Sequence, residues 1–270
     1  MKRLFVFFML TAAVLTACGT KTMPPNMEHG EKGQDQGAVK ADSVKVLWTF
    51  SELKPQAKKD TVIQMHIQNN QGKPIENFDL THEKKLHLIV VSKDLSYFNH
   101  IHPDYKEKGL FDITTQFPTG GDYKLFADFV PSGSSVMTKS EWVKVEGEAV
   151  KPIPIQPDSN LTKVVEGKEV SLVFNELAAN KEIMLTFTIK DEKIKKPITN
   201  LQQYLGAVGH VVTLTENAEQ YLHVHPMEEK ATGPEAKFMT TFPKSGVYKI
   251  WGQFQHENKV FVVPFVVRVP

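Results

Sequence analysis

The chain carries the same pattern twice, and this duplication limits the folds open to it more than any other feature. The segment His87–Pro103 recurs as His210–Pro226, with three histidines and a proline at the same spacing in both copies. A second block, Phe117–Phe129, recurs as Phe242–Phe254 and keeps its Phe-Pro start and its Gly-x-Tyr sequence. A duplication of this extent repeats a whole folding unit, so we predict two similar domains.

The two domains can be placed along the chain. A Pro-rich stretch, residues 150–159, separates the copies and predicts an extended linker. We therefore expect a first repeat at residues 42–149 and a second at residues 160–270. Each holds roughly 110 residues, which is enough to bury a core of its own.

Each repeat is predicted to consist of short strands. Apolar residues alternate or run continuously between turn residues, and no apolar stripe of helical spacing is evident. Tyr123 and Tyr248 lie where immunoglobulin-like sandwiches carry a corner tyrosine. We predict an all-β protein of two tandem Greek-key β-sandwich domains, either immunoglobulin-like or cupredoxin-like. The strands expected in the first repeat are 44–50, 61–68, 85–91, 97–102, 111–116, 123–129 and 141–145.

The repeated histidines lie on a predicted hairpin. A tight loop at residues 93–96 joins its strands and pairs His87 with His102 and Ile89 with His100. His100 and His102 are two residues apart, so they point to one face of the strand. Directly opposed side chains have Cβ atoms roughly 4.5–5.5 Å apart, so the three imidazoles can converge on an ion. The second repeat follows the same pattern, and the predicted metal ligands are His87, His100, His102, His210, His223 and His225.

Nitrogen ligands favour copper over zinc, so we expect a copper ion in each repeat, with zinc as the alternative metal. The competing hypothesis is that these histidines are structural and hydrogen-bonded within the sandwich. The histidines without a counterpart, His66, His82 and His256, are predicted to be surface or loop residues. Candidate auxiliary or outer ligands are Asp104, Asp128, Met23, Met27 and His29.

The N-terminus predicts export and a lipid anchor. Lys2 and Arg3 precede a short apolar stretch, and Leu-Thr-Ala-Cys18 then resembles a bacterial lipobox. Residues 1–17 are the expected signal peptide, Cys18 is the expected site of lipid modification (a diacylglyceryl group, with palmitate), and residues 18–41 are the expected tether. The protein would then be lipid-anchored at the extracytoplasmic face of the cell membrane. An ordinary signal peptide with an incidental cysteine is the alternative.

Composition excludes several classes of function. The chain has 32 Lys and Arg against 31 Asp and Glu, without the basic excess of a general nucleic-acid binder. Its single cysteine excludes a disulfide scaffold and a thiolate zinc site within one chain. No Ser-His-Asp signature, paired carboxylate motif or phosphate-cradling Gly loop is evident, so we do not expect an enzyme.

On His87, His100, His102, Pro103 and their duplicates, both halves resemble the YtkA-like domains of bacterial extracytoplasmic lipoproteins. That resemblance implies small β-sandwiches associated with heavy-metal, especially copper, handling: buffering, delivery or resistance, with a metal transporter or another surface protein as partner. The chain also resembles CopC and cupredoxin sandwiches, but it has neither a free N-terminal histidine nor the Cys-Met pair of blue copper. The alternative function is an immunoglobulin-like interaction or adhesion module with structural histidines.

Overall fold

The computed structural model describes residues 40–270. The predicted signal peptide, the predicted lipidation site Cys18 and the candidate ligands Met23, Met27 and His29 of the expected tether lie outside the described residues. The described residues belong to one compact unit, so both repeats are part of a single body. In the described part of the chain, no helix is long and apolar enough to cross a membrane.

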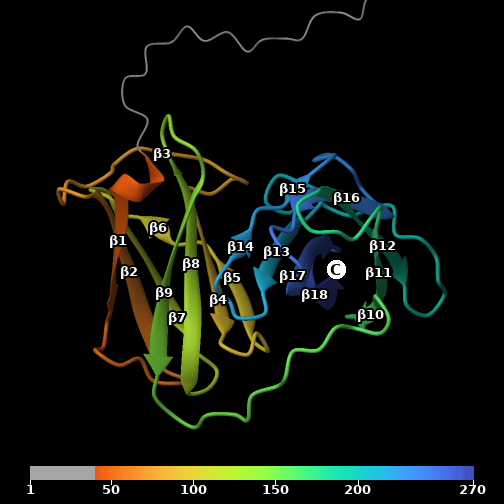
Figure 1. The fold of residues 1–270 in the computed structure, drawn as a ribbon, viewed down its shortest axis with the longest axis horizontal. Coiled ribbons are helices and arrows are strands. Elements are labelled where there is room, and N and C mark those ends of the chain that lie inside the picture. The colour runs from red at the N-terminus through yellow and green to blue at the C-terminus, as the bar shows by residue number, and fades with distance from the viewer. Residues whose placement is uncertain (1–39) are drawn as a thin grey trace, which may run out of the picture. The chain divides into compact units, whose positions relative to one another are not determined.

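The first repeat consists of two antiparallel sheets (Figure 1). One has the strand order β1-β2-β7-β6, and the other has the order β3-β8-β4-β5, with β9 also paired to β8. A short 3-10 turn, η1, precedes them. The bounds are η1 Ala41–Ser43, β1 Val44–Phe50, β2 Asp60–Asn69, β3 Phe78–Asp79, β4 Leu86–Ser92, β5 Phe98–Ile101, β6 Asp104–Tyr105, β7 Leu110–Gln116, β8 Gly121–Pro131 and β9 Met137–Val145.

The second repeat has the same plan. Its sheets have the strand orders β10-β11-β12-β16-β15 and β14-β13-β17-β18. The bounds are β10 Thr162–Val165, β11 Lys168–Phe174, β12 Glu182–Asp191, β13 His210–Thr215, β14 Tyr221–Leu222, β15 His225–Pro226, β16 Glu235–Thr241, β17 Gly246–His256 and β18 Lys259–Val269. The seven strands expected in the first repeat all form, and the largest difference is that β9 begins at Met137 rather than at residue 141.

The arrangement of strands is immunoglobulin-like rather than cupredoxin-like. In the first repeat, β1, β2 and β7 lie in one sheet, while β9, β8, β4 and β5 lie in the other, which is the division of an immunoglobulin sandwich. Both corner tyrosines form the expected hydrogen bond. Tyr123 donates its hydroxyl to the carbonyl of Thr119 at 3.0 Å, and Tyr248 donates to the carbonyl of Lys244 at 2.7 Å. The all-β prediction of two repeated sandwiches is therefore confirmed.

Strand β4 is buried on both of its faces. Leu88 and Val90 pack in the core of the first repeat, whereas Ile89 and Val91 belong to a separate apolar cluster that includes residues of the second repeat. This double burial explains why β4 reads as a continuous apolar run instead of an alternating one. The face of β4 that points away from the core of the first repeat is therefore an interface with the second repeat. Strand β5 lies beside β4 in the same sheet.

The two repeats meet through equivalent surfaces. The ring of Phe98 stacks on Trp251 with centroids 4.8 Å apart, and Tyr221 lies 6.0 Å from Phe126. Phe98 and Tyr221 hold the same position in the two copies, as do Phe126 and Trp251. Such reciprocal contacts define an isologous interface. The cluster between the repeats comprises Ile89, Val91, Leu95, Phe126, Val212, Leu214, Ala218 and Trp251.

Polar contacts follow the same reciprocity. Lys249 of the second repeat donates its ammonium to the carbonyl of Leu95 at 2.7 Å, and Lys124 of the first contacts Glu219 at 3.3 Å. Lys124 and Lys249 are equivalent positions in the duplication. The repeats therefore face each other with a local pseudo-two-fold relation, and both hairpins that carry histidines lie at this interface.

Candidate metal centre

The β4–β5 hairpin has the register that the sequence predicts. Ile89 is paired with His100 and Leu88 with Ile101. His87 lies one residue further along β4, and its ring centroid is 5.2 Å from that of His100 and 5.0 Å from that of His102. One ring nitrogen from each of these three histidines lies within 4.8 Å of the other two. Sequence reasoning thus places the first histidine triad correctly.

The spacing of the nitrogens can be compared with that of a metal site. Nδ1 of His87 lies 3.0 Å from Nε2 of His100. Metal–nitrogen bonds of roughly 2.0–2.1 Å hold tetrahedral ligand nitrogens about 3.4 Å apart. The His87–His100 separation is slightly shorter than this, and all three ligand nitrogens lie within 4.8 Å of one another.

Hydrogen bonds assign the tautomers of two members. Nε2 of His87 lies 2.8 Å from the carbonyl oxygen of Thr81, which can only accept, so Nε2 carries the proton and Nδ1 presents a lone pair. Nδ1 of His100 lies 3.1 Å from Oε1 of Gln253 and donates to it, which leaves a lone pair on Nε2 of His100. With these tautomers two lone pairs face each other across 3.0 Å, a separation that either a shared proton or a cation would satisfy.

The third member has a free nitrogen. Nε2 of His102 is buried and, within the described residues, has no hydrogen-bond partner. A buried polar nitrogen without a partner costs about 1–3 kcal/mol, and it is the kind of exception that a bound ion explains. The donor set, three imidazoles without a thiolate, fits copper or zinc rather than calcium or magnesium. The residues of the triad therefore fit a transition metal ion.

Burial keeps the triad neutral. Desolvation lowers the pKa of His87 to about 4 and that of His102 to about 4, and it lowers the pKa of His100 well below its ordinary value. The nearby ammonium of Lys84 lowers the pKa of His102 further. Because ligation requires the neutral imidazole, these rings are ready to bind an ion without first losing a proton at neutral pH.

The second set of histidines is arranged differently. His210 does not join His223 and His225. Its ring instead lies against rings of the first repeat, 4.6 Å from His100 and 5.7 Å from His87 between centroids. In the described residues, only the first three histidines place their ligand nitrogens together. The expected second, independent triad is therefore not assembled.

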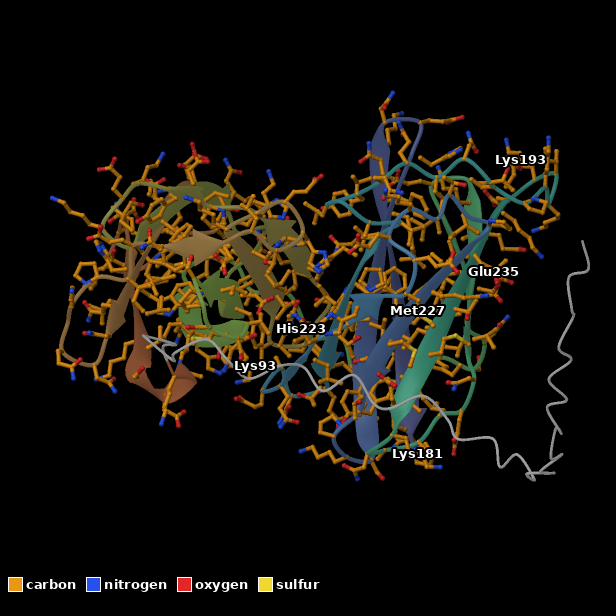
Figure 2. All side chains as sticks on the ribbon, turned by 90° about the horizontal axis from the view of Figure 1, so that it is seen from above. Lys93, Lys181, Lys193, His223, Met227 and Glu235 are labelled. Carbon is orange, nitrogen blue, oxygen red and sulfur yellow. The ribbon has the colours of Figure 1, made fainter. Side chains whose placement is uncertain are left out.

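A difference in strand pairing explains this. In the second repeat the chain joins the β10-β11-β12-β16-β15 sheet at His225, which pairs with Met239 of β16. In the first repeat the equivalent ladder begins later, at Asp104, so His102 stays free of it. His225 is consequently exposed, whereas His102 is half-buried. His223 lies at the side of the second repeat that faces the first (Figure 2), with Nδ1 4.0 Å from Oδ2 of Asp128.

Asp128 and Gln253, which hold equivalent positions, each reach across to the other repeat. Gln253 of the second repeat contacts His100 of the first, and Asp128 of the first lies near His223 of the second. Asp128 also accepts a hydrogen bond from Thr138 at 2.7 Å, and burial raises its pKa to about 6. Asp128, a candidate auxiliary or outer ligand, therefore lies beside a histidine of the opposite repeat and not beside the triad of its own, and Gln253 likewise contacts the opposite repeat.

The unmatched histidines and Asp104 have different surroundings. His82, expected on the surface or in a loop, does lie in a tight turn, and its ring centroid is 5.3 Å from that of His210 and 6.1 Å from that of His87. Its own φ is 46°, a left-handed value that is uncommon for residues other than glycine. Asp104, a candidate auxiliary ligand, is largely exposed and instead pairs with Lys106 at 3.5 Å. His66 and His256 lie outside the cluster, and the prediction of a surface or loop position is wrong for His256, which is buried in β17 beside Asn200.

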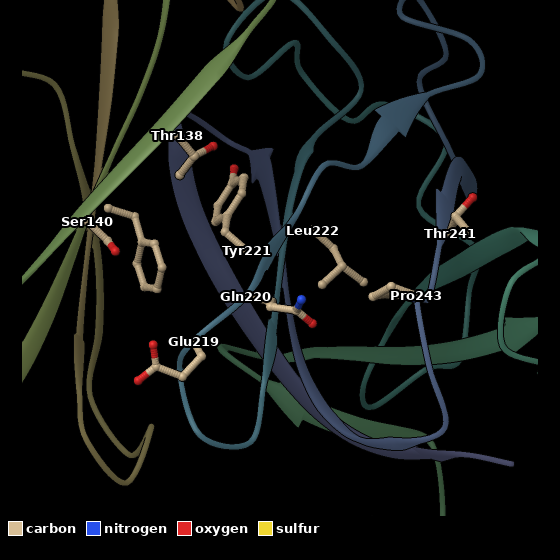
Figure 3. A pocket seen from close by; sticks show the side chains of 9 residues that line it. Thr138, Ser140, Glu219, Gln220, Tyr221, Leu222, Thr241 and Pro243 are labelled. Carbon is tan, nitrogen blue, oxygen red and sulfur yellow. The ribbon is translucent and has the colours of Figure 1, made fainter. Parts of the chain in front are cut away.

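A hollow of about 510 Å³ also lies between the repeats, beside β14 (Figure 3). No histidine lines it, so it is separate from the triad. Ile155 of the linker packs against the apolar cluster between the repeats. The residues that line the hollow are Phe126, Thr138, Ser140, Glu219, Gln220, Tyr221, Leu222, Thr241 and Pro243.

Comparison with protein families places the chain. A family described as a domain of unknown function, DUF8832, matches residues 39–147 and again residues 163–270. The chain belongs to this family. The two matches coincide with the two sandwiches, so each repeat is one copy of the DUF8832 domain. No curated protein matches the sequence of the chain.

Solved structures with similar folds include two bacterial adhesins. FdeC of Escherichia coli is 16% identical, with 87% of this chain and 66% of that chain covered and a TM-score of 0.30. The adhesin InvE of Yersinia pseudotuberculosis is 11% identical, with 87% and 61% covered and a TM-score of 0.26. A pair of fibronectin type III domains from chicken tenascin is 11% identical, with 82% and 97% covered and a TM-score of 0.25. The DUF8832 protein therefore spans less than two thirds of either adhesin chain, and such values support no inference about function.

Proposed function

We propose that this two-repeat DUF8832 protein is an extracytoplasmic binding protein whose ligand is one transition metal ion, copper ahead of zinc, held by His87, His100 and His102. The observation that carries the proposal is the convergence of three neutral ring nitrogens, one of them buried without a partner. Nitrogen donors bind Cu(II) more tightly than Zn(II). The expected stoichiometry is one ion per chain, because the second set of histidines is dispersed.

A paired set of variants tests this proposal. The double variant His100→Ala with His102→Ala should lose stoichiometric Cu(II) binding in competition with a chelator. The matched variant His223→Ala with His225→Ala changes the equivalent residues of the second repeat and should keep it. Both must be prepared without an affinity tag, which would itself bind metal. Absence of one-to-one binding by the unaltered protein, or equal binding by both variants, would contradict the proposal.

The second candidate function is an immunoglobulin-like interaction or adhesion module of the cell surface with structural histidines. On fold alone this function is better supported, because two tandem immunoglobulin-like sandwiches need no ion to bind a partner. The histidine cluster also has an internal use, since His87 and His100 are already tied to Thr81 and Gln253. If this function holds, the histidine variants should lose folding stability and leave metal content unchanged.

Both candidates imply a location outside the cytoplasm. The lipobox-like sequence ending in Cys18 supports anchoring to the membrane by a lipid, and a metal transporter or another surface protein is then a reasonable partner. Replacing Cys18 with Ser should move the protein from the membrane fraction to the soluble fraction, or leave an uncleaved precursor. A variant that fractionates and migrates like the unaltered protein would remove the lipid anchor from the proposal.

A further inference from the structure

Gln253 of the second repeat lies at the centre of the histidine cluster. It is almost fully buried, at 1% exposure, and it pairs with His210 in the β13–β17 ladder. Its amide bridges the two repeats: Oε1 lies 3.1 Å from Nδ1 of His100, and Nε2 lies 3.2 Å from Nδ1 of His210. Both polar ends of the amide are therefore in use, one on each repeat.

The amide of Gln253 points its NH₂ end towards Nδ1 of His210. The NH₂ end can only donate, so Nδ1 of His210 must present a lone pair to it. This orientation leaves Oε1 as the atom that faces His100, and Oε1 can only accept. Nδ1 of His100 must then carry the proton, and its Nε2 lone pair is aimed at His87. A reversed amide would move the proton of His100 to Nε2 and let it bond to Nδ1 of His87, which would close the site.

We infer that the second repeat supplies no ligand to the ion but sets the tautomer of a ligand: His210 orients Gln253, and Gln253 holds His100 in its metal-binding form. This inference rests on the proposed function, because it concerns how affinity is controlled at the same metal site. Hydrogen bonds to the second nitrogen of a ligating imidazole fix its ring and its tautomer, and their loss commonly costs about 10–100-fold in metal affinity.

Coupling between ion binding and contact of the repeats follows. Because Gln253 reaches His100 only when the two repeats are in contact, an ion that prefers the aligned His100 also favours that contact. Linkage makes the effect reciprocal, so whatever separates the repeats should weaken ion binding by the same factor. The duplicated domain would then act as a support for a site that lies in the other copy.

The test uses three variants of the full chain. Gln253→Ala removes both bonds, and Gln253→Glu keeps an acceptor for His100 but no donor for His210. Gln255→Ala is the matched control, two residues further along β17 and without a side-chain bond to the described histidines. We expect Cu(II) affinity, measured by chelator competition, to fall about 10–100-fold for Gln253→Ala, to stay within about tenfold for Gln253→Glu, and to be unchanged for Gln255→Ala.

A second measurement separates this inference from the proposed function. The chemical shifts of the imidazole nitrogens, recorded by ¹⁵N NMR in the ion-free protein, report the tautomer of His100. They should show a protonated Nδ1 in the unaltered protein and a changed or mixed tautomer in Gln253→Ala. If the unaltered protein binds no ion, the proposed function fails while the tautomer still tests the role of Gln253. An unchanged tautomer together with unchanged affinity in Gln253→Ala would overturn the inference.

Discussion

In the first repeat, the chain leaves β5 with His100 and His102 both free to turn towards His87. In the second repeat, the chain pairs with β16 from His225 onward, and the ring of His210 lies against His100 of the first repeat. The spacing of the three histidines is the same in both. What differs is the point at which one backbone ladder begins, and this decides whether equal spacing produces a convergent site or a dispersed set of rings. Equal motifs in a duplicated protein therefore do not imply equal sites.

The largest effect should come from the surface that both repeats share. Trp251→Ala removes a buried ring that stacks on Phe98, and truncation of such a residue costs about 3–5 kcal/mol of unfolding free energy. Phe126→Ala is the equivalent change in the first repeat and should cost a similar amount. Denaturant unfolding measures both. A cost below 1 kcal/mol for either variant would show that the repeats do not depend on this contact.

The second prediction compares the equivalent residues His87 and His210. His87→Gln removes a member of the triad and should weaken Cu(II) binding by more than about 100-fold. This loss exceeds the range of about 10–100-fold for residues that only form a hydrogen bond to a ligand. His210→Gln removes only the partner of Gln253 and should weaken binding by about tenfold or less. Competition with a chelator measures both affinities. Equal losses of affinity would mean that His87 and His210 contribute equally to Cu(II) binding, and they would contradict the proposed difference between the repeats.

The third prediction concerns pH. Burial lowers the pKa values of His87, His102 and His223 to about 4, from 6.5 in an unfolded chain. Between these values the unfolded state binds more protons, so the ion-free protein should lose stability as pH falls from 6.5 to 4. Asp128, whose pKa is raised to about 6, opposes this effect because its stabilisation is lost as pH rises from 3.8 to 6.

Thermal unfolding across this range, without metal, measures the balance. Three histidines outweigh one carboxyl group, so the net slope should be positive. His87→Gln should flatten the slope by removing one of the three histidines, and Asp128→Asn should make it steeper. A profile that is flat from pH 6.5 to 4 would show that these rings are not held neutral by the fold.

The smallest effect should be common to both repeats. Tyr123→Phe and Tyr248→Phe each remove the corner hydrogen bond to a backbone carbonyl, which contributes about 0.5–1.5 kcal/mol to the free energy of unfolding. Tyr123→Phe also removes a hydrogen bond with Oγ1 of Thr119, so its loss should be the larger, by no more than about 1.5 kcal/mol. A larger difference, seen in denaturant unfolding, would mean that the asymmetry of the histidines extends into the sandwich itself.

Much of the fold could be predicted because it depends on local pattern. The seven strands of the first repeat and the pairing of Ile89 with His100 follow from alternation and loop length. The choice of immunoglobulin-like topology could not be made, because it depends on which sheet each strand joins. A further signal was present but unused: β4 is apolar on both faces, and this indicates that its outer face is covered.

The candidate site was only half predictable for a similar reason. The spacing of the histidines predicted the first triad, but it could not show that His225 forms part of β15 and pairs with β16. His82 and Gln253 were underestimated because their equivalents, Leu205 and Asp128, differ in type. Contacts between the repeats bring these residues to the cluster, and a comparison of copies within one sequence cannot show contacts that link one copy to the other.

The linker of residues 150–159 has a consequence for how the shared surface behaves on dilution. Two separate copies of one repeat would meet only at protein concentrations near their dissociation constant, and the contact would vanish in a scarce protein. Joined by about ten residues, the copies experience an effective local concentration in the millimolar range whatever the abundance of the chain. Anything that depends on the meeting of the repeats is therefore available to a single isolated molecule.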